Sequence, residues 1–324
     1  MMARSGKWAF RPSLRPRPEE VRFDLNVALD SMVKLHAEVP EDAFTASLLG
    51  TERTGNGVVI REDGLILTIG DLITEANSIW LTTNAGTVVA GHPLAYDQAT
   101  GLGLVLPLGR LGLPVLPRGS AASAAIGADV IVISHGGCAH ALKAKIIAKR
   151  EFAGHWEYVL DEAVFTAPPH PNWNGAALVD EDGRLLGIGS LVVEEALRGE
   201  AVEGNMFVPI DLLEPILDEM RLGRAAGPPR PWLGMYTMVD DGQLVVGGLA
   251  EGGPAESAGV RLGDMVLEVA GEQVFELADL FRKAWHLGPP GTVIPLTLGR
   301  DGALSRVRVH SADRGDFLKK PRVH

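Results

Sequence analysis

The stretch that decides the fold of the C-terminal region is PAESAGVRLGDMVLEVAG, which runs from residue 254 to residue 271. Pro254 can start a one-turn helix, and Gly259 can end it in the left-handed conformation that glycine adopts without strain. A glycine–aspartate turn follows, and residues 265–269 alternate between the two faces of a strand before a second turn at Gly271. The stretch therefore predicts a short helix followed by a β-strand.

The sequence on both sides of this stretch extends the same small domain. Upstream lie Trp232-Leu-Gly-Met235 and a strand-like QLVVGGL, and downstream a hairpin is expected around Asp301-Gly302. Residues 276–287, ELADLFRKAWHL, have the apolar spacing of a helix. The apolar face of this helix comprises Leu277, Leu280, Phe281, Ala284 and Trp285. The pattern predicts a small α+β domain.

Residues 231–311 resemble a PDZ domain of the bacterial HtrA/DegP type, and the stretch quoted above carries the most specific part of the resemblance. In that family, the loop that matches Trp232-Leu-Gly-Met235 holds the terminal carboxylate of a bound peptide. The peptide-binding residues that the resemblance implies are Leu233, Gly234 and Met235, with Leu277 and Phe281 as walls of a side-chain pocket.

A physical reason supports this use of the loop. Successive backbone N–H groups of a glycine-containing loop converge on an anion, and the strand edge that follows can pair with an extended peptide. The expected partners are therefore protein or peptide C-termini and exposed segments. The alternative is that the segment is only a packed strand whose groove the first domain covers.

A proline-rich linker separates this domain from a longer N-terminal one. From about residue 32 to residue 193, short β-branched runs alternate with turn residues, as in sandwiches and barrels. Residues 209–220 have the apolar spacing of an amphipathic helix. The predicted organisation is an N-terminal arm (1–30), a barrel domain (31–221), the linker (222–231), the PDZ domain (232–313) and a basic tail (314–324).

The first domain is similar to the trypsin-like double six-stranded β-barrel that precedes the PDZ domain in HtrA-type proteases. The resemblance covers about residues 54–193 and includes TGNGVVIREDGLILT near its start and NWNGAALV at residues 172–179. It implies a mainly β fold followed by a C-terminal α+β domain. It also implies where a catalytic triad would lie, and the histidine, aspartate and serine positions hold Asp71, Gly101 and Asn174.

These three substitutions remove the groups that serine proteolysis needs, namely a hydroxyl, an imidazole that deprotonates it and a carboxylate that orients the imidazole. An asparagine amide is a very poor nucleophile, and Asn172 replaces the glycine that would donate an oxyanion-hole N–H. Loss of the nucleophile alone costs roughly 10⁶-fold in turnover in a working enzyme. The sequence therefore predicts no catalytic residue, and we expect Trp173 to fill the vacated cleft.

Other histidines and the single cysteine offer alternative chemistry. His170 lies four residues before Asn174 and could approach the cleft, but no serine or cysteine occupies the matching position. His135, Cys138 and His140 form a short group that could suit a metal ion or a reactive thiol. Because the group offers only three ligands and lacks a second cluster, we expect an ordinary loop, with no metal and no cofactor.

Composition disfavours several other classes of protein. The 324 residues carry a net charge of −11, which disfavours nucleic acid and anionic lipid as partners. One cysteine excludes an internal disulfide framework. No apolar run is long enough to span a membrane, so no membrane insertion is expected, and the basic N-terminus lacks the apolar segment of a signal peptide. We therefore expect a cytoplasmic location, although HtrA-type proteins usually act outside the cytoplasm.

Two functions and one mode of assembly remain open. The first function is a non-catalytic pseudoprotease that binds peptides in a scaffold, regulatory or chaperone-like role. The second is an active serine endopeptidase, which requires a serine within hydrogen-bond distance of a histidine in the first domain. The resemblance also implies a homotrimer built through an N-terminal arm, with Trp8, Phe10 and Phe23 as anchors. The alternative is an unstructured basic arm.

Overall fold

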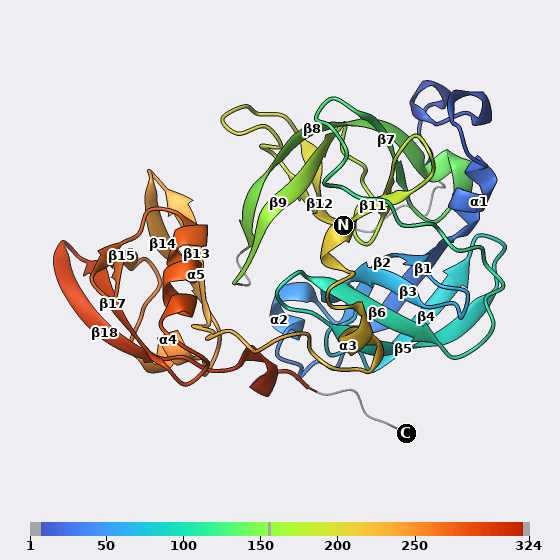
Figure 1. Ribbon diagram of the computed structural model, residues 1–324. Coiled ribbons are helices and arrows are strands. Elements are labelled where there is room, and N and C mark those ends of the chain that lie inside the picture. Colours follow the sequence, from blue (N-terminus) through green and yellow to red (C-terminus); the bar gives the residue numbers. More distant parts are fainter. Residues whose placement is uncertain (1–7, 155–156, 320–324) are drawn as a thin grey trace. The chain divides into compact units, whose positions relative to one another are not determined.

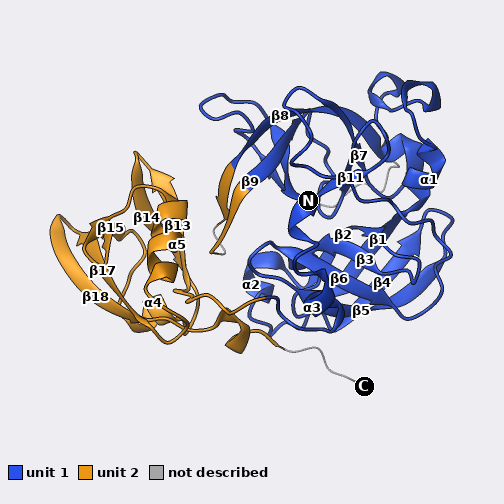
Figure 2. Cartoon of the chain, viewed as in Figure 1, with its two compact units in different colours: residues 1–150, 162–226, 320–324 blue, residues 151–161, 227–319 orange. Residues whose placement is uncertain are grey.

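A computed structural model describes residues 8–154 and 157–319 of the chain. The chain divides into two compact units, which Figure 2 shows in blue and orange. Within the described residues, unit 1 comprises residues 8–150 and 162–226, and unit 2 comprises residues 151–154, 157–161 and 227–319. The second unit therefore contains the predicted C-terminal domain and also a short segment from the middle of the chain.

Unit 1 is built on two closed, antiparallel six-stranded barrels (Figure 1). Around the first barrel the strands are β1 (Met32–Glu38), β2 (Glu52–Val59), β3 (Ile66–Ile69), β6 (Leu102–Pro107), β5 (Val88–Tyr96) and β4 (Ser78–Thr83). Around the second they are β7 (Asp129–Ile133), β8 (Ala141–Gly154), β9 (Tyr158–Ala167), β12 (Gly204–Pro209), β11 (Leu185–Val193) and β10 (Ala177–Val179). The two barrels thus repeat one topology, and the predicted double barrel is confirmed.

Alternation of apolar and polar residues explains why these strands close into barrels. In β1 the buried side chains include Met32, Val33, Leu35 and Ala37, and the exposed ones are Lys34 and Glu38. The second barrel encloses a cluster of fully or nearly fully buried residues that includes Val132, Leu142, Ile146, Val164, Leu178 and Phe207. Closure pairs every strand on both sides, so neither barrel leaves an open sheet edge.

The helices of unit 1 are short. They are α1 (Leu25–Asp30), α2 (Ala46–Leu49) and α3 (Leu217–Arg221), with the 3-10 helices η1 (Pro12–Leu14), η2 (Pro18–Glu20), η3 (Gly70–Leu72), η4 (Gly137–His140) and η5 (Ile210–Leu212). The prediction of a continuous helix over residues 209–220 is wrong, because the structure splits this segment into η5 and α3. Pro215 lies between the two pieces, and its missing N–H and its ring both interrupt a helix.

The aromatic residues of the N-terminal arm contact the second barrel of their own chain. The ring of Trp8 lies 4.4 Å from that of His140, and the ring of Phe10 lies 5.0 Å from that of His170, measured between centroids. Phe23 packs over Gly183, where an added Cβ would lie 2.5 Å from the ring. The described part of the arm therefore packs against its own chain, and the homotrimer stays a prediction.

Unit 2 contains a six-stranded antiparallel sheet and two α-helices. The strand order is β13 (Met235–Asp240), β14 (Gln243–Leu249), β15 (Met265–Val269), β17 (Val293–Arg300) and β18 (Ala303–His310), and β16 (Glu272–Gln273) pairs with β15. The helices are α4 (Pro254–Ser257) and α5 (Leu277–His286), followed near the C-terminus by the 3-10 helix η6 (Arg314–Asp316). The predicted helix at Pro254, the strand at 265–269 and the long helix are confirmed.

The C-terminal boundary of unit 2 lies beyond the predicted domain end at residue 313. Residues 314–319, which the sequence assigned to a basic tail, belong to unit 2. Arg314 is buried, and the ring of Phe317 lies 4.9 Å from that of Trp232. In the described part of the chain, no helix is both long enough and apolar enough to cross a membrane.

Candidate functional site

The loop from Trp232 to Met235, at the start of the sheet of unit 2, is the first candidate site. Trp232 exchanges two backbone hydrogen bonds with Ala312, at 2.9 and 3.0 Å. The carbonyl of Leu233 accepts from the N–H of Ala255 at the first turn of α4, at 2.8 Å. These bonds attach the loop to the segment around Ala312 and to the first turn of α4. They do not use the N–H groups of Leu233 and Gly234, which donate to another acceptor.

Glycine is required at position 234 for two reasons. Its φ angle is +71°, in the left-handed region that other residues rarely adopt. An added Cβ would also lie 3.1 Å from the Trp232 ring, 3.2 Å from Pro254 and 3.3 Å from Ala250. The backbone can therefore turn its N–H groups out of the loop only because no side chain is present there.

The acceptor of these N–H groups is the side-chain carboxylate of Glu157. The N–H of Leu233 donates to both carboxylate oxygens, at 3.1 Å to Oε1 and 3.0 Å to Oε2, and the N–H of Gly234 donates to Oε1 at 2.9 Å. Glu157 belongs to the segment 151–161 of unit 2 and is only 4% exposed. The loop thus binds a carboxylate in the way that the resemblance implies for a peptide C-terminus.

Burial dominates the electrostatics of this carboxylate. It raises the pKa of Glu157 to about 7, against the opposing effects of the N–H groups of Leu233, Gly234 and Met235 and of the positive charge of Arg314. Burial likewise raises the pKa of Tyr236, the next residue of β13. The carboxylate therefore carries a cost of desolvation that its hydrogen bonds offset only in part.

The other predicted peptide-binding residues surround the same apolar core. Leu233, Met235 and Phe281 are buried members of one cluster, and Leu277 is half-buried and packs against it. The ring of Phe281 stacks on that of Trp285, with 5.8 Å between the centroids. The structure thus brings all five predicted residues together, and their contact with a peptide stays a prediction.

The second candidate site is a cavity of about 260 Å³ within unit 1. Its lining residues come from both barrels and are Lys34, Thr54, Gly55, Asn56, His135, Pro171, Asn172, Trp173 and Asn174. Of the three degenerate triad positions, only Asn174 lines this cavity. Trp173, expected to fill the cleft, is half-buried and forms part of the wall.

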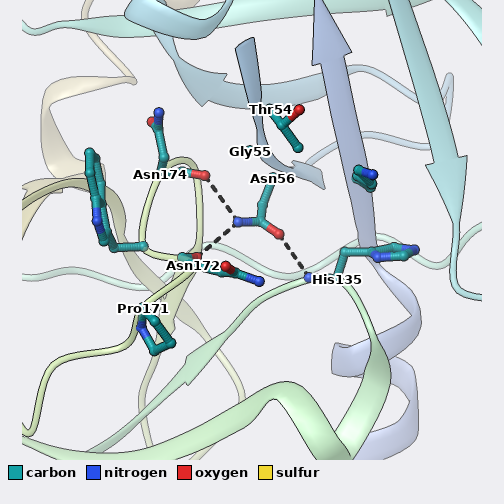
Figure 3. A pocket seen from close by; sticks show the side chains of 9 residues that line it. Thr54, Gly55, Asn56, His135, Pro171, Asn172 and Asn174 are labelled. Atoms are coloured by element: carbon teal, nitrogen blue, oxygen red, sulfur yellow. Dashed lines mark hydrogen bonds between the residues drawn. The ribbon is translucent and has the colours of Figure 1, made fainter. Parts of the chain in front are cut away.

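Asn56 of β2 binds the loop that carries Asn174. Its Nδ2 donates to the carbonyls of Asn172 and Asn174, each at 3.0 Å, and its Oδ1 accepts from the N–H of His135 at 2.9 Å, as Figure 3 shows. Its own N–H also donates to the carbonyl of Asn174 at 2.8 Å. This buried carboxamide therefore holds segments of both barrels together at the cavity floor.

The N–H at the predicted oxyanion-hole position has a fixed partner inside the protein. The N–H of Asn172 donates to Nδ1 of His170 at 3.0 Å, and Nε2 of His170 lies 2.9 Å from the carbonyl of His140. The ring is therefore a neutral imidazole that carries its proton on Nε2. Burial lowers the pKa of His170 to about 4, so both ring nitrogens serve the structure and His170 is not free to act as a base.

Asp71 and Gly101 lie beside this region. The N–H of Gly70 donates to the carbonyl of Gly101 at 2.7 Å, and the guanidinium of Arg53 donates to the carbonyl of Asp71 at 2.8 Å. Gly101 has a φ angle of +78°, so an aspartate at this position would be strained. A Cβ added at Gly55 would lie 2.5 Å from the side chain of Leu72 and 2.7 Å from the carbonyl of Asn174, so Asn174 and the neighbour of Asp71 both pack against β2.

In the described part of the chain, no serine hydroxyl forms a hydrogen bond with a histidine ring. Ser134, next to His135, donates to the carbonyl of His140 at 3.1 Å. A hydroxyl and an imidazole do meet where Thr54 Oγ1 lies 3.2 Å from His36 Nδ1, across the β1–β2 pair. This contact lies on the exposed face of the strands and involves a threonine.

The group His135, Cys138 and His140 is dispersed in the structure. Cys138 is exposed and His135 lines the cavity, whereas His140 packs against Trp8. Among the described residues, no three His, Cys, Asp or Glu side chains lie close enough together to hold a metal ion.

Sequence reasoning missed two residues that organise these sites, Asn56 and Glu157. The motif TGNGVVI contains Asn56 but gives no indication that its side chain reaches a loop more than 100 residues away. Glu157 lies 76 residues before the loop that binds it. No sequence pattern marks either contact, because both depend on tertiary structure.

Comparisons with known proteins match both units. Residues 55–188 match the family model of a trypsin-like peptidase domain, and residues 231–310 match that of a PDZ domain. A probable periplasmic serine endoprotease, DegP-like, from Halomonas elongata is 26% identical over 278 residues, which cover 82% of this chain and 57% of that protein. The serine endoprotease DegS from Haemophilus influenzae is 24% identical over 81% of this chain and 77% of its own length.

Solved structures show the same fold. The HtrA-type protease AlgW with tripeptide matches 92% of this chain and 98% of its own, with a TM-score of 0.51 and 17% identity. A serine endoprotease from Yersinia pestis matches 91% and 99%, with a TM-score of 0.50 and 22% identity. The chain therefore combines a trypsin-like peptidase domain with a C-terminal PDZ domain, and in this it is similar to the HtrA-type serine proteases.

Proposed function

We propose that this chain is a non-catalytic protein of the HtrA type that binds protein C-termini or exposed peptide segments through its PDZ domain. The role of the double barrel is then that of a scaffold, in a regulatory or chaperone-like function.

One observation carries the binding part of the proposal, namely the two N–H groups of Leu233 and Gly234 that converge on a single carboxylate. A peptide C-terminus presents the same chemical group. The edge of β13, which follows the loop directly, offers the backbone N–H and C=O groups with which an extended peptide can pair.

The chemistry of the barrel cavity supports the non-catalytic part. Asn174 offers a carboxamide where a hydroxyl nucleophile would be needed. The N–H of Asn172 already donates to His170, so an oxyanion would find one donor fewer. Restoring a serine alone would therefore supply only one of the missing parts.

The binding part is tested on the full chain with a pool of decapeptides that have free C-termini and four randomised last residues. We expect binding to this pool and loss of binding to the same pool with amidated C-termini. Gly234→Ala should weaken binding on the order of 10- to 100-fold, because the loop cannot keep its conformation. The matched control is Gly242→Ala, which has a similar φ of +74° but no neighbour within 4 Å.

An active serine endopeptidase is the alternative, since relatives such as DegS carry that name. Incubation with an unfolded protein, together with a serine-directed covalent probe, distinguishes the two functions. The pseudoprotease proposal expects neither cleavage nor labelling. Turnover that survives an Asn174→Ala substitution and disappears with loss of a serine would establish the alternative.

Assembly as a homotrimer also remains a proposal, drawn from the family resemblance. Light scattering on the full chain tests it, and a mass close to 34.5 kDa would contradict it.

A further inference from the structure

The segment 151–161 belongs to unit 2 although the chain enters and leaves it through strands of the second barrel, as Figure 2 shows by its orange colour. Within the segment, the N–H of Glu157 donates to the carbonyl of Gly154 at 3.1 Å. Glu157 has a φ angle of +61°, a conformation that is costly for a residue with a side chain. Such strain is retained where surrounding contacts compensate for it.

The contacts at the two ends of this segment hold it against α5. Arg282 of α5 forms ion pairs with Glu151 and with Asp161, the latter at 2.6 Å. Between them, Ala153 and Val159 pack against the core cluster of the PDZ sheet. The segment is therefore held to α5 through Arg282, and it packs against the same core cluster as the half-buried Leu277 that was predicted to bound the peptide pocket.

The carboxylate of Glu157 uses the donors that a peptide C-terminus would need. Each backbone N–H directs one hydrogen at one acceptor group, and the N–H groups of Leu233 and Gly234 both point at Glu157. With Glu157 only 4% exposed, no room remains in the loop for a second carboxylate. Binding of a peptide and docking of Glu157 are therefore mutually exclusive.

We propose that Glu157 is an internal ligand of the PDZ domain: its carboxylate closes the peptide site in cis, and a peptide binds only by displacing it. This inference rests on the proposed peptide-binding function and adds a means of regulation to it. A tethered ligand competes at an effective concentration on the order of millimolar or more, so weak peptides do not open the site. The apparent affinity of a peptide is reduced by the fraction of open molecules.

The test measures binding of the full chain to the randomised decapeptide pool, immobilised through N-terminal biotin. Glu157→Ala should lower the half-saturating protein concentration about tenfold or more, because the site no longer has to open. Glu157→Gln keeps the size of the side chain without its charge and should give a smaller decrease. The matched control is Glu162→Gln on β9, the strand that follows Glu157, where an exposed carboxylate pairs with Lys149 in unit 1.

Hydrogen exchange of the N–H groups of Leu233 and Gly234 gives a second readout that needs no peptide. In the wild-type chain these amides should be protected, and in Glu157→Ala they should exchange faster, while the N–H of Ala255 keeps its protection through its bond to Leu233. Unchanged protection of both amides in Glu157→Ala would overturn the inference.

The outcomes separate this inference from the function on which it rests. Equal binding of wild type and Glu157→Ala to the pool would overturn the internal-ligand proposal and leave peptide binding intact. Absence of binding in both variants, with both folded by circular dichroism, would overturn peptide binding itself and the competition with it.

Discussion

Two loops of the molecule carry backbone N–H groups at places where an anion could bind, and they differ in what those groups contact. In the barrel unit, the N–H of Asn172 donates to the ring of His170, which is fully buried. In the PDZ unit, the N–H groups of Leu233 and Gly234 donate to the carboxylate of Glu157. A core imidazole cannot leave without disrupting the barrel, whereas one carboxylate can replace another.

This difference suggests how a protease cleft and a peptide site can diverge within one chain. In the cleft, the N–H of Asn172 donates to a buried side chain of the barrel, and the carboxamide of Asn56 binds the same loop. The donors of the PDZ loop remain directed at an exchangeable group. Under the proposed function, loss of proteolysis and retention of peptide binding both follow from the partners of a few N–H groups.

The largest effect is expected in the barrel unit, where Asn56 binds the loop that carries Asn172 and Asn174. Asn56→Ala removes three side-chain hydrogen bonds and leaves the N–H of His135 and the carbonyl of Asn172 without their partner. Because Asn56 is only 4% exposed, we expect the barrel unit to lose about 3 kcal/mol of stability. Hydrogen exchange by mass spectrometry along a urea series measures this for the barrel peptides separately.

Asn84→Ala is the control for that measurement. Its carboxamide also makes two hydrogen bonds to backbone groups, to Leu29 and Gly136, each 2.8 Å long, but it is only half-buried. Water can replace those bonds, so the expected loss is about 1 kcal/mol. Equal losses in the two variants would contradict the special role assigned to Asn56.

The second largest effect is expected in the PDZ unit, whose stability should depend on pH through Glu157. The pKa of Glu157 is raised from 4.5 to about 7 in the folded unit, so the folded state binds an extra proton between these values. The contribution of this extra proton to the free energy of unfolding is fully present below pH 4.5 and is lost as the pH rises through 7. Between pH 5 and pH 8, the wild-type unit should lose about 2 to 3 kcal/mol relative to Glu157→Gln.

Denaturant unfolding of unit 2 at several pH values, followed by hydrogen exchange, measures this difference. Glu256→Gln is the control, because Glu256 also accepts a backbone N–H, that of Gly252, but is exposed to solvent. Its stability should run parallel to that of the wild type over the same range. A constant difference between wild type and Glu157→Gln at all pH values would contradict a buried carboxylate in the loop.

The parts of the fold that the sequence predicts well are those determined by local patterns. The strand at residues 265–269 matches β15, because its alternation and its flanking glycine turns specify both ends. The helix at residues 209–220 was predicted wrongly, because apolar spacing was given more weight than Pro215. Local chemistry thus determines the elements, provided that the residues that interrupt them are weighed as heavily as the periodicity.

The candidate sites could be predicted only in part. Gly234 was identifiable, because a carboxylate-binding loop needs a glycine and a family pattern marks its position. Glu157 was not, because its role depends on a hairpin whose tip packs on a domain 76 residues further along the chain. Nothing in the composition of residues 151–161 distinguishes them from the tip of any exposed hairpin.

The smallest expected effect tests whether the carboxylate or its surroundings hold the hairpin segment in place. Arg282→Ala removes both ion pairs to this segment, but Arg282 is 45% exposed and Asp161 is 92% exposed, so solvent screens them. We therefore expect peptide binding to tighten only about two- to threefold, and less at high salt. Arg306→Ala, an equal loss of charge at an exposed position of β18, should leave binding unchanged. If Arg282→Ala tightened peptide binding as much as Glu157→Ala does, the ion pairs of Arg282 would be what keeps the peptide site closed. The carboxylate of Glu157 would then occupy the loop without controlling access to it.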